Sequence, residues 1–205
     1  MIDALDNAFQ LVILAICVVL SATRLFQTRS DEWLMSSGFY GCSLLALTYW
    51  TAYLLVFGGT PHYFYVSETG WVASRVFLLM LVAALDERRR PCAPVPMAWA
   101  AVAVMAPLFA LYVTHGDVLL NVVDCSIMAA IGFYTVRGMA AAPLEGSEGD
   151  RRLHAAAFVW WLAQLAVWTT SCFQTPEAYA SYIASDLALS VTYLLLALEM
   201  RRALP

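Results

Sequence analysis

The chain has 205 residues, of which 62% are hydrophobic and only 13% are charged. Soluble domains are close to half apolar and a quarter charged, so the composition excludes an ordinary soluble domain and indicates an integral membrane protein. The formal net charge of −4 excludes little, because the charges are segregated along the chain. We expect one transmembrane domain, residues 1–205, with no separate soluble domain.

Seven apolar segments are predicted as membrane-spanning helices, because each is close to the length that crosses the hydrocarbon core of a bilayer. They cover about residues 4–25, 33–57, 69–86, 96–114, 117–139, 153–174 and 178–199. The first segment has neither a basic leader nor a small-residue cleavage motif, so we interpret it as a retained helix. The predicted fold is therefore an all-α, seven-helix transmembrane bundle in the lipid bilayer.

Arginine placement predicts the orientation of this bundle. Ten of the eleven arginines follow the odd-numbered segments, at Arg24, Arg29, Arg88, Arg89, Arg90, Arg137, Arg151, Arg152, Arg201 and Arg202. The even-numbered connections contain no arginine. Because basic residues remain on the cytoplasmic side, we expect the N-terminus outside and the C-terminus inside, in a multi-pass protein of the inner (plasma) membrane.

The eleventh arginine, Arg75, lies within the third apolar segment. An unpaired charge at that depth is costly, so we expect a partner in the bundle interior, either Asp124 in the fifth segment or Asp186 in the seventh. Two interpretations stand side by side. The pair is either a structural ion pair or part of a site that handles a ligand or an ion.

Metal and enzyme chemistry find little support in the sequence. The five cysteines are scattered through apolar runs without metal-ligand spacing or a disulfide framework, and the three histidines fall at helix ends or in loops. Ser190 has no histidine at comparable depth to activate it as a nucleophile. We therefore expect neither an enzyme nor a bound metal, and no nucleic-acid partner.

One face of the predicted sixth helix is aromatic. Trp161, Gln164 and Trp168 follow one another at spacings of three and four residues, so they lie on the same side of a helix. This pattern is compatible with ordinary packing between helices. It is equally compatible with one wall of a slot for a flat, apolar ligand that a few polar groups orient.

Four stretches resemble the microbial (type 1) rhodopsin family. Residues 56–59 resemble the end of its second helix, and residues 70–81 resemble its third helix, with Trp71 at the position of an indole that lies on one face of retinal. Residues 161–168 resemble its sixth helix. Asp186 and Ser190 resemble the seventh helix, in which an aspartate is followed four residues later by the retinal-binding lysine.

The departures from that family are equally specific. Ser190 stands in place of the lysine, and the chain contains no lysine at all, so retinal cannot bind through a Schiff base. Gly70 and Leu81 occupy the positions of the proton acceptor and donor, so we expect no light-driven proton transport. The resemblance therefore implies a lysine-less member of the family. The residues that it implies for ligand binding are Trp71, Trp161, Gln164, Trp168, Asp186 and Ser190.

Three functions remain open at this point. The resemblance implies non-covalent binding of retinal, a carotenoid or another apolar molecule, or a sensory role as partner of a second copy or of another rhodopsin. The second hypothesis is an ion or proton conductor that uses Arg75, Asp124 and Asp186. The third is a structural or assembly protein whose core is filled by side chains.

Overall fold

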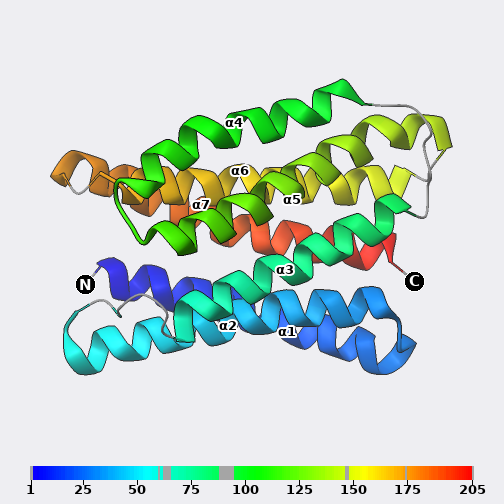
Figure 1. Ribbon diagram of the computed structural model, residues 1–205. Coiled ribbons are helices and arrows are strands. Elements are labelled where there is room, and N and C mark those ends of the chain that lie inside the picture. Colours follow the sequence, from blue (N-terminus) through cyan, green and yellow to red (C-terminus); the bar gives the residue numbers. More distant parts are fainter. Residues whose placement is uncertain are drawn as a thin grey trace.

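The computed structural model describes residues 2–59, 61, 66–87, 95–145, 148–173 and 175–204. The described residues form seven α-helices, as the apolar segments predict (Figure 1). The helices are α1 (Ile2–Thr28), α2 (Asp31–Phe57), α3 (Val66–Glu87), α4 (Pro96–Val113), α5 (Val118–Glu145), α6 (Glu148–Ser171) and α7 (Pro176–Ala203).

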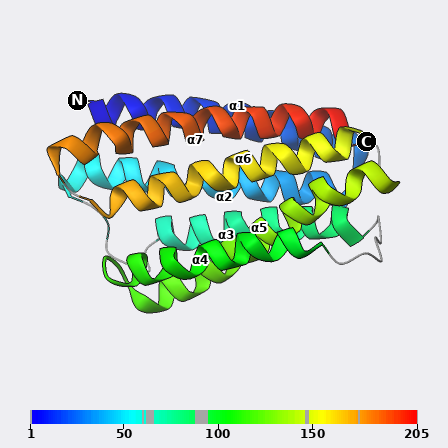
Figure 2. The same cartoon turned by 90° about the horizontal axis from the view of Figure 1, so that it is seen from above.

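The helices run side by side along one axis, and six of them form a closed ring. Around the ring, each of α1, α2, α3, α5, α6 and α7 packs against the next, and α7 packs back against α1. Helix α4 lies outside this ring, against α5 and the edge of α6 (Figures 1 and 2). In this ring α3 therefore packs against α5, where chain order alone would put α4.

Local sequence explains where several helices begin and end. The Ser30 side chain accepts a hydrogen bond from the Trp33 backbone N–H at the start of α2, and Thr175 does the same for Ala178 at the start of α7. Helix α2 ends at Gly58, whose φ of 68° is left-handed and favours glycine, and whose N–H donates to the Leu54 carbonyl. These local hydrogen bonds define where α2 and α7 begin and where α2 ends.

Six of the seven described helices are long and apolar enough to cross a membrane, and α6 is the exception. Its first turn carries Glu148 and Asp150, followed by two arginines, which lowers its hydropathy. Large apolar side chains also face outward along α1, spaced by three or four residues, at Leu5, Phe9, Val12, Ile16 and Val19. Such a continuous apolar exterior suits contact with lipid, and the chain is a multi-pass membrane protein.

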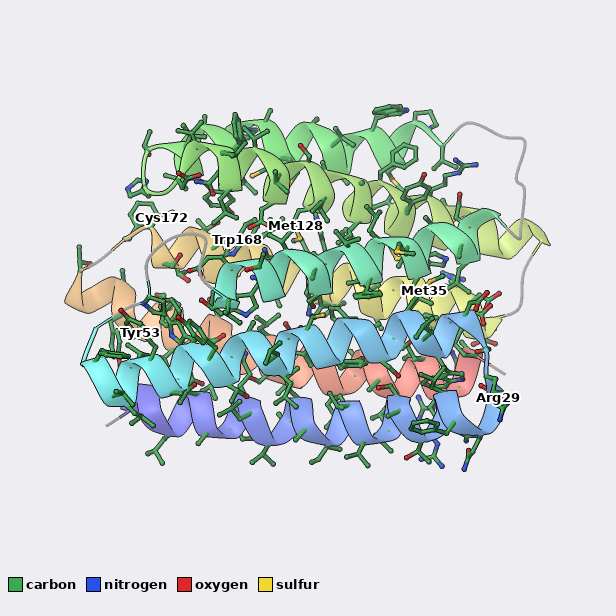
Figure 3. The ribbon with its side chains drawn as sticks, turned by 60° about the horizontal axis from the view of Figure 1, so that its bottom comes forward. Arg29, Met35, Tyr53, Met128, Trp168 and Cys172 are labelled. Carbon is green, nitrogen blue, oxygen red and sulfur yellow. The ribbon has the colours of Figure 1, made fainter. Side chains whose placement is uncertain are left out.

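The two ends of the bundle differ in charge. The arginine-rich end holds the α1–α2 and α5–α6 connections and the C-terminus, and seven of the eight described arginines lie toward it. Figure 3 shows Arg29 and Met35 at this end, opposite Tyr53 and Cys172. The other end, here called the N-terminal end, holds the α4–α5 and α6–α7 connections. Arg88, Arg89 and Arg90 lie outside the described residues.

An aromatic cluster fills the bundle between α2, α6 and α7. It consists of Phe39, Tyr40, Trp160 and Tyr193, all buried. The Phe39 ring meets that of Trp160 edge-on, with ring centroids 5.3 Å apart, and lies 5.6 Å from that of Tyr193. Such edge-to-face contacts contribute beyond the burial of area itself. One member of this cluster, Tyr193, also lines the cavity described next.

Candidate functional site

A cavity of about 350 Å³ lies inside the ring on the side of the N-terminal end. All seven helices contribute to its wall, and residues of the α4–α5 turn line it as well, at His115 and Gly116. Figure 3 shows Trp168 and Cys172, two of the lining residues, on this side of the bundle. The cavity combines three tryptophans with three acidic side chains and one arginine, namely Trp50, Trp71 and Trp168 with Glu68, Asp124, Asp186 and Arg75.

Arg75 and Asp124 form a buried ion pair in the wall of this cavity. The Arg75 Nη1 donates to the Asp124 Oδ1 at 2.6 Å, and the two side chains are only 5% and 9% exposed. The Arg75 guanidinium also lies over the Trp168 ring, 4.3 Å from its centroid, in a cation–π contact. The prediction of an internal partner for Arg75 is confirmed, and Asp124 is the partner.

Asp186 has a different set of neighbours. Its Oδ1 accepts a hydrogen bond from the Gln10 Nε2 at 3.2 Å, and Asp6, one turn before Gln10 on α1, is buried as well. The two buried aspartates of the cavity wall thus have separate partners, because Asp124 pairs with Arg75 and Asp186 with Gln10.

The tryptophan walls are themselves held in place. Trp50 of α2 and Trp71 of α3 lie against each other, with ring centroids 5.5 Å apart. On the opposite side, Trp168 of α6 meets Tyr112 of α4 edge-on at 5.5 Å. The Tyr112 hydroxyl donates to the Leu165 carbonyl at 3.3 Å. Helix α4 therefore holds the Trp168 side chain in position, although α4 itself lies outside the ring of six helices.

Four of the six residues predicted for ligand binding line the cavity, namely Trp71, Gln164, Trp168 and Asp186. The other two, Trp161 and Ser190, lie outside its lining. The Trp161 Nε1 donates to the Met128 carbonyl at 2.7 Å, and its ring packs beside Gly132. Ser190 is fully buried, and its hydroxyl has no hydrogen-bond partner among the described residues.

The sequence-based search missed Asp6 and Gln10, although a signal for them existed. The two residues are four apart in the first half of α1, so they share one face of that helix. A pair of polar side chains at helical spacing inside a spanning segment indicates a polar interior contact. Trp50, Tyr112 and Tyr193 were missed for a different reason, because a single aromatic residue carries no spacing pattern.

The wall of this cavity combines aromatic and polar groups. Within the described ranges, no group of three or more His, Cys, Asp or Glu side chains is placed to hold a metal ion. The wall instead offers flat aromatic faces, amide and hydroxyl groups and fixed charges, which are the features of a site for a small organic molecule. Comparison of the chain with family models, with curated proteins and with solved structures finds no match.

Proposed function

We propose that this membrane protein binds a small organic ligand non-covalently in the cavity at the N-terminal end of the bundle. The observation that carries the proposal is the combination of three tryptophan rings and a buried Arg75–Asp124 pair around one space of about 350 Å³. Ligand sites of this kind have volumes of roughly 300–1,000 Å³ and apolar walls with a few convergent polar groups.

A flat ligand fits this geometry better than a bulky one. Trp71 and Trp50 form one wall from α2 and α3, and Trp168 forms part of the wall on α6. The Arg75 guanidinium covers one face of the Trp168 ring. A ligand would therefore contact the edge of that ring and the side of the cavity that Trp71 forms. Gln164 and Asp186 supply hydrogen-bonding groups for a polar end of the ligand.

Retinal remains our first candidate within this class, and the absence of lysine restricts it to non-covalent binding. Its single polyene chain with one ring is compatible with a space of this volume. A carotenoid is about twice as long, so only one of its ends could enter, with the remainder outside. The choice of retinal depends on the proposed resemblance to microbial rhodopsins.

The conduction hypothesis receives less support from the same residues. An ion path would have to continue from Asp186 toward the arginine-rich end. Tyr193 lines the cavity and belongs to the aromatic cluster, whose members Phe39 and Trp160 are buried to within 1% of completely. Aromatic packing of this kind disfavours the passage of an ion. An assembly role without a ligand remains the alternative that the binding experiment tests.

We further propose that α6 crosses the membrane as the seventh span, because it is a full member of the helix ring. Its charged first turn would then lie at headgroup level on the arginine-rich end. By the positive-inside rule this end faces the cytoplasm, so the cavity opens to the outside of the inner (plasma) membrane.

A titration of the purified protein with all-trans retinal tests the proposal. Binding would quench tryptophan fluorescence, and Trp71→Ala should weaken the apparent affinity at least tenfold, which corresponds to about 1.4 kcal/mol. Trp99→Ala is the matched control, because Trp99 lies on α4, is 64% exposed and does not line the cavity. Equal affinities in the wild type and in both variants would show that retinal binds elsewhere and would refute the proposal.

A further inference from the structure

A second cavity opens at the arginine-rich end, between α1, α2 and α7. Its volume is about 250 Å³, and it shares no lining residue with the first cavity. The polar side chains around it include Arg24 and Gln27 of α1, Trp33 and Tyr40 of α2, and Arg201 of α7. Among the described residues, no acidic side chain lines it.

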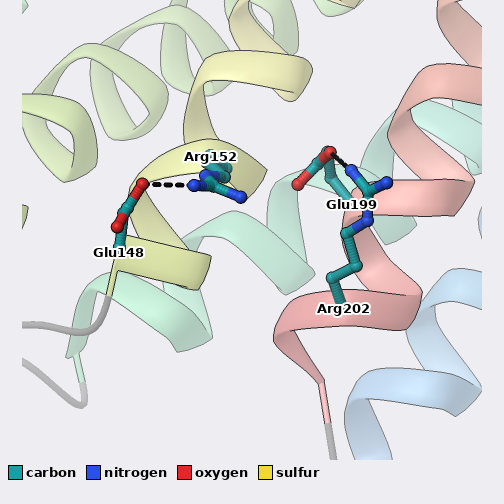
Figure 4. A network of polar contacts seen from close by, with 4 residues as sticks. All are labelled: Glu148, Arg152, Glu199 and Arg202. Carbon is teal, nitrogen blue, oxygen red and sulfur yellow. Dashed lines mark hydrogen bonds and ion pairs between the residues drawn. The ribbon is translucent and has the colours of Figure 1, made fainter.

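The two arginines of this cavity differ from three other arginines at the same end, which have acidic partners. Figure 4 shows Arg152 paired with Glu148 and Arg202 paired with Glu199 at the same end of the bundle. Arg137 is paired with Asp86 at 3.4 Å. Among the described residues, no carboxylate forms an ion pair with Arg24 or Arg201. Their N–H donors therefore remain available to an anion.

Arg24 is the more constrained of the two. It is half-buried in the last turns of α1, whereas Arg201 is exposed in the last turn of α7. The two helices are neighbours in the ring, so residues 177 positions apart in the chain present two positive charges to one space. Two guanidinium groups at one cleft attract an anion more strongly than separate surface arginines would.

We propose that this cavity binds a phosphate group, held between Arg24 and Arg201. Arginine presents planar pairs of N–H donors that match two oxygens of a phosphate, which makes it the preferred residue for such recognition. The Gln27 amide lies at the same cavity and offers a neutral donor beside the charges. The site is separate from the proposed ligand cavity, so it goes beyond the proposed function.

The phosphate can belong to an acidic phospholipid or to a soluble phosphate ester. A basic pocket between helices at headgroup level favours the lipid, whose acyl chains would follow the apolar exterior of α1. Leu20 and Ala197 in the cavity wall extend it toward the hydrocarbon region. Both sources share the recognition chemistry, and the experiment separates them.

The test uses the full chain purified in detergent and measures lipid binding by native mass spectrometry and by the shift in Tm. Dioleoyl phosphatidylglycerol should bind and raise Tm, whereas dioleoyl phosphatidylcholine should do neither. Arg24→Gln with Arg201→Gln should weaken phosphatidylglycerol binding at least tenfold. Arg151→Gln with Arg29→Gln is the matched control, because it removes the same charge at the same end, from residues that do not line the cavity.

Inorganic phosphate and glycerol 3-phosphate form the soluble arm of the experiment. An increase in Tm when these anions are added to the wild type would support the site and assign it to a soluble ester, provided that the increase is lost in the Arg24→Gln, Arg201→Gln double variant. Equal phosphatidylglycerol binding by both double variants would refute the proposal, since the effect would then be one of general charge. If the double variant fails to fold, Arg24→Lys with Arg201→Lys keeps the charge and should still weaken binding. Unchanged binding by that variant would refute arginine-specific recognition.

Discussion

Gln10 and Asp186 are 176 residues apart in the chain, yet their side chains form a buried hydrogen bond of 3.2 Å. This bond joins α1 to α7, the contact that closes the helix ring. Asp6, one turn before Gln10 on α1, is a second buried polar residue on the same helix. The first and last helices are thus joined by polar groups inside an otherwise apolar interface.

A double-mutant cycle on this contact should reveal coupling between the two helices. Gln10→Met and Asp186→Leu each remove one partner while keeping similar volume, and the double variant removes both. We expect a coupling energy of about 1 kcal/mol, typical of a buried hydrogen bond. The free energies of unfolding of the wild type and the three variants, measured by titration with sodium dodecyl sulfate, give this coupling energy. Additive effects would mean that the hydrogen bond contributes nothing to closure of the ring.

Removal of Arg75 should destabilise the protein strongly. Arg75→Met leaves Asp124 buried without its partner, and breaking a buried pair in this way costs about 3–5 kcal/mol. The double variant Arg75→Met with Asp124→Leu should recover part of that loss, because it leaves no buried charge behind. Thermal unfolding followed by circular dichroism measures both effects.

Arg152→Met is the control for that experiment. Arg152 pairs with Glu148 on the surface of α6, where both side chains are more than half exposed. Exposed pairs contribute little, so this variant should unfold near the wild-type temperature. If Arg152→Met lowered the unfolding temperature as much as Arg75→Met does, burial would not be the reason for the Arg75 effect.

The helices and their order were predictable from the sequence, because apolar length and charged connections are local signals. The predicted segment 69–86 lies inside α3, and 178–199 lies inside α7. The internal partner of Arg75 followed from the cost of an unpaired charge, but the choice between Asp124 and Asp186 did not. That choice depends on α5 lying next to α3 in the ring, a packing relation with no local signature.

The candidate site was predictable only in part, for a similar physical reason. Spacing correctly brought Gln164 and Trp168 to one inward face of α6, yet spacing does not tell how deep a cavity extends. Trp161 lies two turns from Trp168 on that face, where α5 approaches closely enough for its ring to fill the space beside Gly132. Depth follows from the packing of neighbouring helices rather than from any single helix.

The contact between Gly132 and Trp161 gives a sharp test of this packing. A Cβ at position 132 would lie 2.9 Å from the Trp161 ring and 3.1 Å from the Ala101 Cβ. Gly132→Ala should therefore destabilise the protein by about 1–3 kcal/mol, since overpacking forces a rigid ring to move. In Gly41→Ala, by contrast, the new methyl group meets nothing within 4 Å. That variant should be neutral or up to about 1 kcal/mol more stable.

Both glycines lie within helices, so the change in helix propensity is the same in the two variants. The difference between their unfolding free energies then reports the contact with Trp161. Equal stability of Gly132→Ala and Gly41→Ala would show that the Trp161 ring is not held as described.

The proposed relation to microbial rhodopsins is tested most directly at Ser190. Ser190 is one turn from Asp186 on α7, and its chain neighbour Leu189 lines the ligand cavity, as does Tyr193. A lysine at position 190 has a flexible four-carbon stem, which can carry its amine from the packed core toward that cavity. Asp186 would then lie beside a protonated Schiff base and stabilise its charge.

We therefore expect Ser190→Lys, supplied with all-trans retinal, to form a coloured adduct with a visible absorption band that sodium borohydride fixes to the chain. Ala188→Lys is the control, because position 188 lies at similar depth on α7 but on its exposed face. An amine there can react only with retinal dissolved in the lipid, without a neighbouring carboxylate to shift its absorption. A Ser190→Lys protein that folds, judged by its Tm, but stays colourless would show that side chains fill the path from position 190 to the cavity. That result would count against a surviving retinal pocket and would favour an assembly role for the bundle.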